Sequence, residues 1–489
     1  MIMLLTTAWQ ITRTGWKLSM QVPIVAPSPI VEKHSVAFRD LFENRCQYEH
    51  FQNYLTALMV LENKSLSNIS RCVLSSADKT NLSRFFSQSP WSDSEVTDRR
   101  LEYLIEQTEK HRRAVKDSCL LLDDTLCEHV GSLFEYVARH YDHCEGGYPL
   151  AHNLVTSHFV SGAVRFPVDA RLYRRYEEKT NWEFFVEKHF PERKIPTKSK
   201  ERNKFHQEVD GHLLLDPEFA RLHSEFETKI MLAVQLIESA VRRKLPFKIV
   251  LMDSWYLAPR VIECLQKHEL DWVSLLKKNR KIETASFTLR DELDKKIESA
   301  GPHLKVEDLV KLIPASAFKQ VTVGDKEYWC FALNVRIPDL GKVRLVISYS
   351  DAKLDDTFAA LVTNRTDWSA KKIIESYLQR WPIETFYQDS KGHLGLDEYR
   401  MRGAEAAKKH WCLVFVAYSL LHLNCLEASP KKRQPLLRPI KTIGEACRGQ
   451  GQALLENLIL KAHNLMQQGE SVSATFSKLF AKQQPAMAC

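Results

Sequence analysis

The chain lacks the features that mark several common classes of protein. Its 11 cysteines are scattered, with no Cys-x-x-Cys pair, so we expect reduced thiols in a cytosolic protein rather than a disulfide framework. The first basic residue is Arg13, so no positive segment precedes an apolar run and no secretory signal is predicted. The best membrane candidate, residues 411–426, has only 16 residues and contains His422 and Asn424, which predicts a buried helix and no membrane span. A glycine-rich GxxxxGK(S/T) loop is also absent, and we expect no nucleotide cofactor.

Basic residues are grouped along a chain of otherwise ordinary composition. The 489 residues are 44% hydrophobic and 27% charged, which is typical of a globular protein, and the formal charge of +8 is mild for this length. A single basic run is commonly a solvated face, but four runs favour a polyanionic partner. The four runs cover residues 193–204, 242–244, 277–281 and 431–433.

One stretch near residue 380 carries four functional groups at helical spacing. At about 100° per residue, one narrow stripe of a helix holds Tyr377, Arg380, Glu384 and Lys391. A solvated helix face has no need of this order, whereas a site that binds a metal with the carboxylate and a phosphate with the cations does. Pro382 is expected to kink or restart the helix, which would place Glu384 one turn into the new helix.

Acidic residues stand at the ends of two predicted apolar strands. Asp123 and Asp124 end the first strand, and Asp253 ends a later one that is almost wholly apolar. A single aspartate at a strand end is often a turn or helix cap. Two of them together with Glu384 form a set of hard oxygen ligands, which Mg²⁺ prefers. Two such ions can activate the attacking oxygen and neutralise the leaving oxygen in phosphodiester cleavage, so we predict a metal-dependent site at the strand ends.

A second cluster of residues suggests zinc as a rival interpretation. Its members are Cys127, His129, His140, His143 and Cys144. Their spacing matches no compact zinc motif, and they fall in strand regions with alternating faces, so we favour the carboxylate site.

Periodicity divides the chain into segments of different character. Strand and helix signals alternate in its centre, which predicts an α/β core with helices on the faces of a sheet. Two short helices around a serine break near the N-terminus suit either a helix-turn-helix or a plain helical bundle. The expected segments are a flexible lead (1–30), a helical domain (31–115), the first part of the core (116–281), a mostly β insertion with a hairpin (282–350), the second part of the core (351–427), and a linker with a helical tail (428–489).

Individual elements can also be predicted. The expected strands are 118–123, 133–141, 150–160, 247–253, 272–276, 328–337, 343–349 and 358–363. The expected helices include 217–243 and 259–267, and Ser369 is expected to cap the helix that leads towards Arg380.

The spacing Y-x2-R-x3-E-x6-K resembles the signature of the insertion-sequence-four superfamily of DDE transposases. The run Lys391-Gly-His-Leu-Gly-Leu-Asp-Glu-Tyr-Arg400-Met-Arg402, then His410-Trp411 and an apolar helix, is similar to the sequence that follows that signature. The resemblance implies an RNase-H-like catalytic core and a helical N-terminal domain that binds DNA. It also implies cut-and-paste transposition, in which hydrolysis at the element ends is followed by transfer of the freed 3′-hydroxyl to target DNA.

The resemblance assigns roles to particular residues. In the family the first metal-binding aspartate directly precedes a threonine, which points to Asp124 rather than Asp123, although one residue of register reverses the face. The implied catalytic and metal-binding residues are Asp124, Asp253 and Glu384, with Mg²⁺ or Mn²⁺ as the ion. The residues similar to those that bind DNA phosphates are Tyr377, Arg380 and Lys391, and His393, Arg400 and Arg402 could extend this track.

Several alternatives stay open on the sequence. The resemblance implies double-stranded DNA as the partner, a homodimer that pairs two element ends, and a cytoplasmic protein associated with the bacterial nucleoid. The same residues would suit a nuclease that cuts without joining strands, or an inactive protein that only grips the ends. Tyr377 could pack in the core instead of contacting a phosphate, and Trp329 on the insertion either packs in the core or stacks on an unpaired base.

Overall fold

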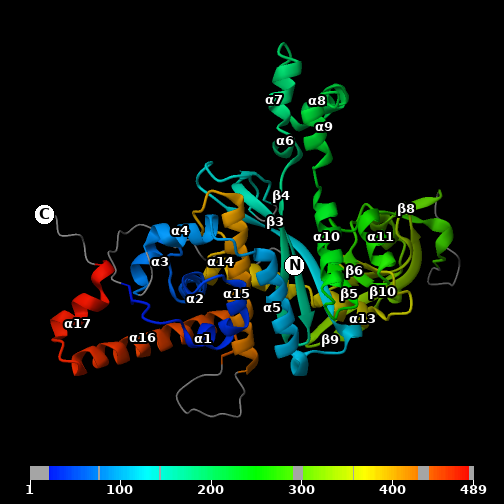
Figure 1. Ribbon diagram of the computed structural model, residues 1–489. Helices are drawn as coiled ribbons and strands as arrows, with labels where there is room; N and C mark the ends of the chain where they lie inside the picture. The colour runs from blue at the N-terminus through cyan, green and yellow to red at the C-terminus, as the bar shows by residue number, and fades with distance from the viewer. Residues whose placement is uncertain are drawn as a thin grey trace.

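The computed structural model describes residues 21–74, 78–142, 145–289, 301–355, 357–427 and 440–483. Its centre is a large mixed sheet with helices on both faces (Figure 1). The strands of this sheet are β1 (Cys119–Glu128), β2 (Ala138–Arg139), β3 (Leu150–Ser161), β4 (Val164–Tyr173), β5 (Ile249–Met252), β6 (Asp271–Leu275), β9 (Lys319–Val323), β10 (Lys326–Ile337), β11 (Gly341–Tyr349) and β12 (Ala359–Thr363). A separate two-stranded sheet pairs β7 (Lys281–Glu283) with β8 (His303–Lys305).

The order of the strands places β1 and β5 side by side at the centre. The sheet runs β2-β3-β1-β5-β6-β12-β11-β10-β9, with β4 paired to the other part of β3. β1 is antiparallel to β3 but parallel to β5, and β5 is parallel to β6. β5 is apolar at every position and fully buried, as expected of a strand covered on both faces. In its register with β1, Leu122 pairs with Met252, so Asp123 of β1 lies beside Asp253, the first residue after β5.

Most of the strands predicted from the sequence occur in the structure, but the first continues to Glu128, the second is shorter, and β4, β7, β8 and β9 were not predicted. The expected strand 133–141 is reduced to β2. β4 contains Pro167, and proline argues against a central strand. β4 pairs only with β3, so it lies at an edge, and the register between them shifts at Ser157 and His158, where Pro167 is accommodated.

The predicted β insertion extends the core sheet. β12 is antiparallel to β6, and β11, β10 and β9 follow it in order. The expected hairpin is therefore present as β10 and β11, but its hydrogen bonds continue those of the core instead of forming a separate unit.

Helices from both ends of the chain form one body beside the sheet (Figure 1). The N-terminal helices are α1 (Pro29–Ser35), α2 (Arg45–Val60), α3 (Leu66–Cys72), α4 (Lys79–Ser87) and α5 (Asp93–Gln107). The C-terminal helices are α15 (Ala404–Glu427), α16 (Ile443–Gln467) and α17 (Val472–Leu479). α1, α2, α4 and α5 all contact α15, which is buried along most of its length. The segment predicted as helical is helical, and it shares its core with the end of the chain.

The predicted flexible lead lies mostly outside the described residues, which begin at 21. Ile24 is fully buried and forms a bridge with Val73, so the last part of the lead is packed against α3. The linker from 428 to 439 is also outside the described part of the chain.

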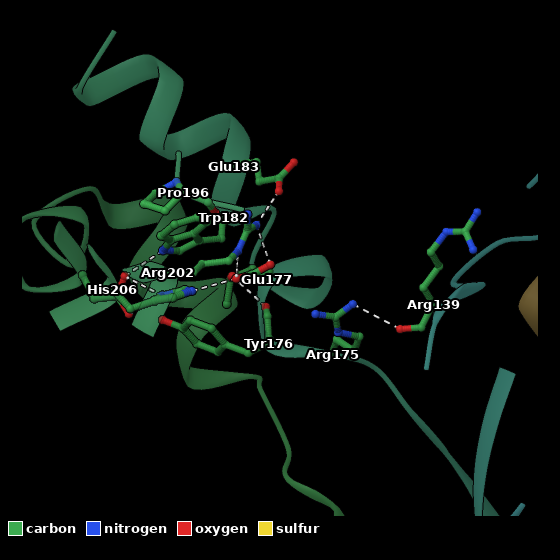
Figure 2. A network of polar contacts seen from close by, with 11 residues as sticks. Arg139, Arg175, Tyr176, Glu177, Trp182, Glu183, Pro196, Arg202 and His206 are labelled. Carbon is green, nitrogen blue, oxygen red and sulfur yellow. Dashed lines mark hydrogen bonds and ion pairs between the residues drawn. The ribbon is translucent and has the colours of Figure 1, made fainter. Parts of the chain in front are cut away.

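A helical arm, residues 176–224, projects from the sheet between β4 and α10 (Figure 1). Its helices are α6 (Tyr176–Lys179), α7 (Trp182–His189), α8 (Ser199–Leu213) and α9 (Pro217–Ser224). It has its own small apolar core, centred on Trp182, Phe205 and Phe219. Figure 2 shows Arg202 joined to Glu177 and Glu183, and His206 joined to Glu177, beside this core. The arm was not predicted, and the expected helix 217–243 is divided into α9 and α10 (Lys229–Arg242).

The remaining helices cover the two faces of the sheet. α10 and α11 (Pro259–Lys267) pack on one face, and α13 (Ala370–Leu378) with the start of α14 (Trp381–Leu394) packs on the other. α12 (Val306–Lys311) follows β8. Among the described residues, no helix is both long and apolar enough to cross a membrane. The cysteines in the described part of the chain are free thiols.

Candidate functional site

Asp123, within β1, lies next to Asp253, which directly follows β5. The sequence predicted that the first strand ends at Asp123 and Asp124, but β1 continues to Glu128, because its pairing with β3 extends that far. Cys119 and Leu121 of β1 share a face with Leu251 of β5, and this apolar face packs against α13 and the start of α14. Side chains alternate along a strand, so Asp123 and Asp253 continue this same face. The Asp253 carboxylate accepts a hydrogen bond from the backbone N–H of Trp255 at 2.8 Å, which fixes its direction.

Arg380 joins Asp123 to the helix that carries Glu384. Its Nη1 lies 2.6 Å from Asp123 Oδ2, and its Nη2 lies 2.5 Å from Glu384 Oε1. Only 16% of the Arg380 side chain is exposed, against 21% for Asp123 and 38% for Glu384. One guanidinium therefore pairs with two carboxylates that come from separate parts of the chain.

A break in the helix gives Arg380 and Glu384 these positions. α13 begins at a cap in which the Ser369 side chain accepts from the backbone of Lys372, and it ends at Leu378. α14 begins anew at Trp381 with Pro382 in its first turn, which confirms the predicted restart. Glu384 also lies in that first turn, where the helix dipole favours a carboxylate.

The Asp123 carboxyl is harder to ionise than an exposed one. Burial raises its pKa to about 6, and although the Arg380 guanidinium opposes this, the carboxylates of Asp124 and Asp253 add to the rise. Both burial and neighbouring like charges disfavour the ionised form.

Tyr377 stands at the end of α13 beside the same groups. Burial raises the pKa of its phenol to about 12, so it keeps its proton and can donate a hydrogen bond. It also packs against the apolar face formed by β1, β5 and α13. The ring of Tyr377 is therefore packed in the core, as in one of the two alternatives, while its hydroxyl lies among the charged groups. Its contact with a phosphate stays a prediction.

Asp124 points to the opposite face of the sheet. Its carboxylate lies 2.8 Å from Lys229 Nζ of α10 and accepts a hydrogen bond of 2.8 Å from the Tyr256 hydroxyl. The sequence prediction selected Asp124, whereas the structure brings Asp123 to Arg380, Glu384 and Asp253. The physical reason is the alternation along β1, which a sequence motif does not report.

The other predicted DNA-binding residues extend away from the carboxylates. Lys391 lies two helical turns beyond Glu384 on α14, close enough to Cys127 at the end of β1 to act on the pKa of that thiol. His393 is exposed and lies against Gly444 of α16, where an added Cβ would fall 2.8 Å from its Nε2. Arg400 and Arg402 are exposed between α14 and α15.

Two aromatic residues near the site were not singled out from the sequence. Trp255 is 55% exposed two residues after Asp253, and Lys277 Nζ lies 5.2 Å from the centre of its ring. Trp381, next to Arg380, is 67% exposed.

The zinc cluster suggested by the sequence does not assemble among the described residues. His129 contacts Tyr399 instead of another ligand, Cys127 is buried at the end of β1, and His143 and Cys144 lie outside the described residues. In the part of the chain that is described, one group of three metal-ligating side chains has its ligand atoms all within 4.8 Å of one another. It is Glu238, Cys264 and His268, on α10 and around the end of α11, and it was not predicted.

The acidic residues of the candidate site are spread more widely than that group. The carboxylate oxygens of Asp123, Asp253 and Glu384 are not all within 4.8 Å of one another. The Arg380 guanidinium lies between Asp123 and Glu384 and keeps them apart. Carboxylates that share two ions about 3.5–4 Å apart need not touch one another. All three offer oxygen ligands of the kind that Mg²⁺ takes, and their excess negative charge fits such ions.

Comparison with known families gives two overlapping matches. Residues 37–290 match the model described as DDE superfamily endonuclease, which is just over half of the chain. Residues 165–420 match the model described as transposase DDE domain, again just over half. The first match includes β1 and β5, and the second includes β5 and α14. No curated protein matches the chain.

Proposed function

Because the chain belongs to the DDE superfamily of endonucleases and transposases, we propose that it is a cut-and-paste DNA transposase of the insertion-sequence-four type. The proposal goes beyond the family in naming the subfamily, the strand transfer and the ends of a mobile element as substrate. The observation that carries it is the Arg380 guanidinium, which pairs with both Asp123 and Glu384, while Asp123 lies next to Asp253 through the pairing of β1 with β5. The spacing from Tyr377 to Lys391 supports the subfamily.

The strand arrangement supports an RNase-H-like core. β3 is antiparallel to both β4 and β1, whereas β1, β5 and β6 run parallel to one another. Asp123 lies on β1, Asp253 directly follows β5, and Glu384 lies on α14. In this layout residues 116–281 and 351–427 form the catalytic core and the helices of residues 31–115 bind the element ends. α3 and α4, which contact each other, are the elements we assign to end recognition.

We assign the metal ligands to Asp123, Asp253 and Glu384, with Mg²⁺ or Mn²⁺ as the ion. Their carboxylate oxygen atoms are the hard ligands that a divalent cation of this kind takes. The chemistry that such ions supply is activation of the attacking oxygen and neutralisation of the leaving one. Asp124 is the alternative first ligand, and its contacts with Lys229 and Tyr256 would then have to open.

The chain's own cations would hold the DNA backbone near these carboxylates. Arg380 offers a planar fork that can exchange a carboxylate for a phosphate, and the Tyr377 hydroxyl can donate to a neighbouring phosphate oxygen. Lys391 adds a point charge farther along α14. Trp255, beside Lys277, offers a ring on which an unpaired base can stack.

The decisive experiment is cleavage of supercoiled DNA that carries the native element ends. We expect nicking to require Mg²⁺ or Mn²⁺, and to be lost in Asp123→Asn and Asp253→Asn while binding to the ends is retained. Retained cleavage by Asp123→Asn together with loss in Asp124→Asn would move the first ligand to Asp124. Retained cleavage in all three variants would remove the assignment.

A second assay separates the three interpretations of the same fold. Pre-cut ends with a free 3′-hydroxyl are supplied with target DNA, and joined products are measured. A transposase joins them, and a nuclease nicks the supercoiled substrate without joining. An end-binding protein does neither. The mass of the complex between the protein and the element ends tests the homodimer, which should contain two chains and two ends.

A further inference from the structure

We propose that Glu238, Cys264 and His268 form a zinc site that ties α10 to α11. The site lies apart from the carboxylates of the proposed catalytic centre and does not depend on the proposed function. One ligand atom from each residue lies within 4.8 Å of the others.

The two helices present these side chains to each other. Cys264 and the residue at the end of α11, His268, are four positions apart, so they lie on one face of the helix. Glu238 is on α10, which packs against α11 along the same face of the sheet (Figure 1). Ligands around a tetrahedral zinc ion lie about 3.6 Å apart when the bonds are about 2.0–2.3 Å long. The observed spacing therefore closes with a shift of side chains alone.

The histidine at this place has an unpaired ring nitrogen, and the cysteine is buried. The Nε2 atom of His268 is shielded from solvent and has no hydrogen-bond partner. Cys264 is only 5% exposed, and its contacts are with the core between the two helices. A buried polar atom without a partner in a native structure calls for an explanation, and an ion bound beside it is one. Glu238 accepts from Lys267 through one oxygen at 3.1 Å, on the solvent side.

The combination of ligands selects the metal. Thiolate and imidazole favour zinc, whereas Mg²⁺ and Mn²⁺ prefer carboxylate, carbonyl and water. As the Zn–S bond forms, the S–H bond of Cys264 breaks and its proton passes to solvent. Three protein ligands leave one tetrahedral position, which a water molecule completes.

A zinc ion here would affect the position of Asp253 only indirectly, through the two helices that flank β5. α10 precedes β5 in the chain, and α11 follows it. Asp253 is the first residue after β5, in the loop that leads to α11. An ion that ties the two helices together restrains both ends of this strand. We therefore expect a stabilising ion, and no direct part in cleavage.

Zinc binding by the full-length protein tests the site. The protein is freed of metals with a chelator, saturated with Mg²⁺ to occupy carboxylate sites, and titrated with Zn²⁺ alone. We expect one tight equivalent per chain, a rise of several degrees in the thermal midpoint, and, with Co²⁺ in place of zinc, a thiolate-to-metal absorption band. His268→Gln and Cys264→Ser should each weaken this binding by more than about 100-fold, since even the outer partners of metal ligands contribute 10- to 100-fold.

Matched controls come from the same chain. Cys46→Ser removes an exposed cysteine, and His303→Gln removes an exposed histidine, and both should keep the zinc equivalent and the thermal response. Asp253→Asn should keep them as well, which separates this site from the catalytic one. No tight equivalent in the wild-type protein, or an unchanged one in His268→Gln, overturns the proposal. Because His268 is only partly buried, its variant stays informative if Cys264→Ser fails to fold.

Discussion

Asp123→Asn should stabilise the metal-free protein at neutral pH. Burial, reinforced by Asp124 and Asp253 and opposed by Arg380, raises the pKa of Asp123 to about 6 from 3.8. Between about pH 4 and pH 6 the folded protein holds a proton that the unfolded chain has already lost. Stability therefore falls as the pH rises through this window, and the loss is about 3 kcal/mol at pH 7.5. Asparagine is neutral at every pH and removes this loss.

The expected gain depends on pH in a way that identifies its cause. Proton linkage predicts that Asp123→Asn raises the free energy of unfolding by about 3 kcal/mol at pH 7.5 and by about 1 kcal/mol at pH 4.5. Urea unfolding in the presence of a chelator, at both pH values, measures it. Only 21% of the Asp123 side chain is exposed, so screening by solvent is small. Added Mg²⁺ should raise the unfolding midpoint of the wild type and leave that of Asp123→Asn unchanged, because an ion that binds only the folded state stabilises it by mass action.

Asp124→Asn is the matched control for this experiment. Its carboxylate is paired with Lys229 and accepts from Tyr256, so its loss should destabilise the protein at pH 7.5 by about 1–3 kcal/mol. The reasoning fails if Asp123→Asn is no more stable than the wild type at pH 7.5. It also fails if the gain is as large at pH 4.5, since the ionised carboxylate would then not be its source.

Three further predictions follow from the site and the arm. Arg380→Gln should weaken binding to element ends and lower the slope of log affinity against log salt by about 1, whereas an unchanged slope would place Arg380 away from the phosphates. Trp255→Ala should weaken binding to single-stranded end DNA about 10- to 100-fold, with most affinity restored in Trp255→Phe, and equal loss in both would exclude stacking. Arg202→Ala should speed proteolysis within the arm, because it removes the partner of Glu177 and Glu183, while Lys198→Ala, whose side chain is 81% exposed, should not. Equal cleavage rates would show that the arm does not depend on this network.

Local patterns were enough to predict the elements that carry the site. The apolar run before Asp253 is a strand because four consecutive apolar residues suit burial on both faces. The restart of the helix at Pro382 follows from the chemistry of proline, and the Ser369 cap from its side-chain oxygen. These patterns each involve only a few neighbouring residues, so they can be recognised from the sequence without knowledge of the fold.

Features that depend on long-range pairing were not predictable in the same way. Whether Asp123 or Asp124 meets Glu384 depends on the face of β1 that α13 and α14 cover, which the strand itself does not specify. The extension of the sheet by the insertion depends on β12 pairing antiparallel with β6. β4 was missed because its Pro167 is compatible only with an edge, and being an edge is a property of the whole sheet.

The helical body beside the sheet ties the first part of the chain to the last. The Tyr54 hydroxyl and His410 Nδ1 lie 2.7 Å apart, and Arg100 of α5 donates to Ser419, more than three hundred positions later. During synthesis, the apolar faces of α1, α2, α4 and α5 that pack on α15 stay exposed until α15 has left the ribosome. A chain that stopped before residue 404 would lack α15 and would leave these faces uncovered. Completion of the helical body therefore depends on the end of the described chain.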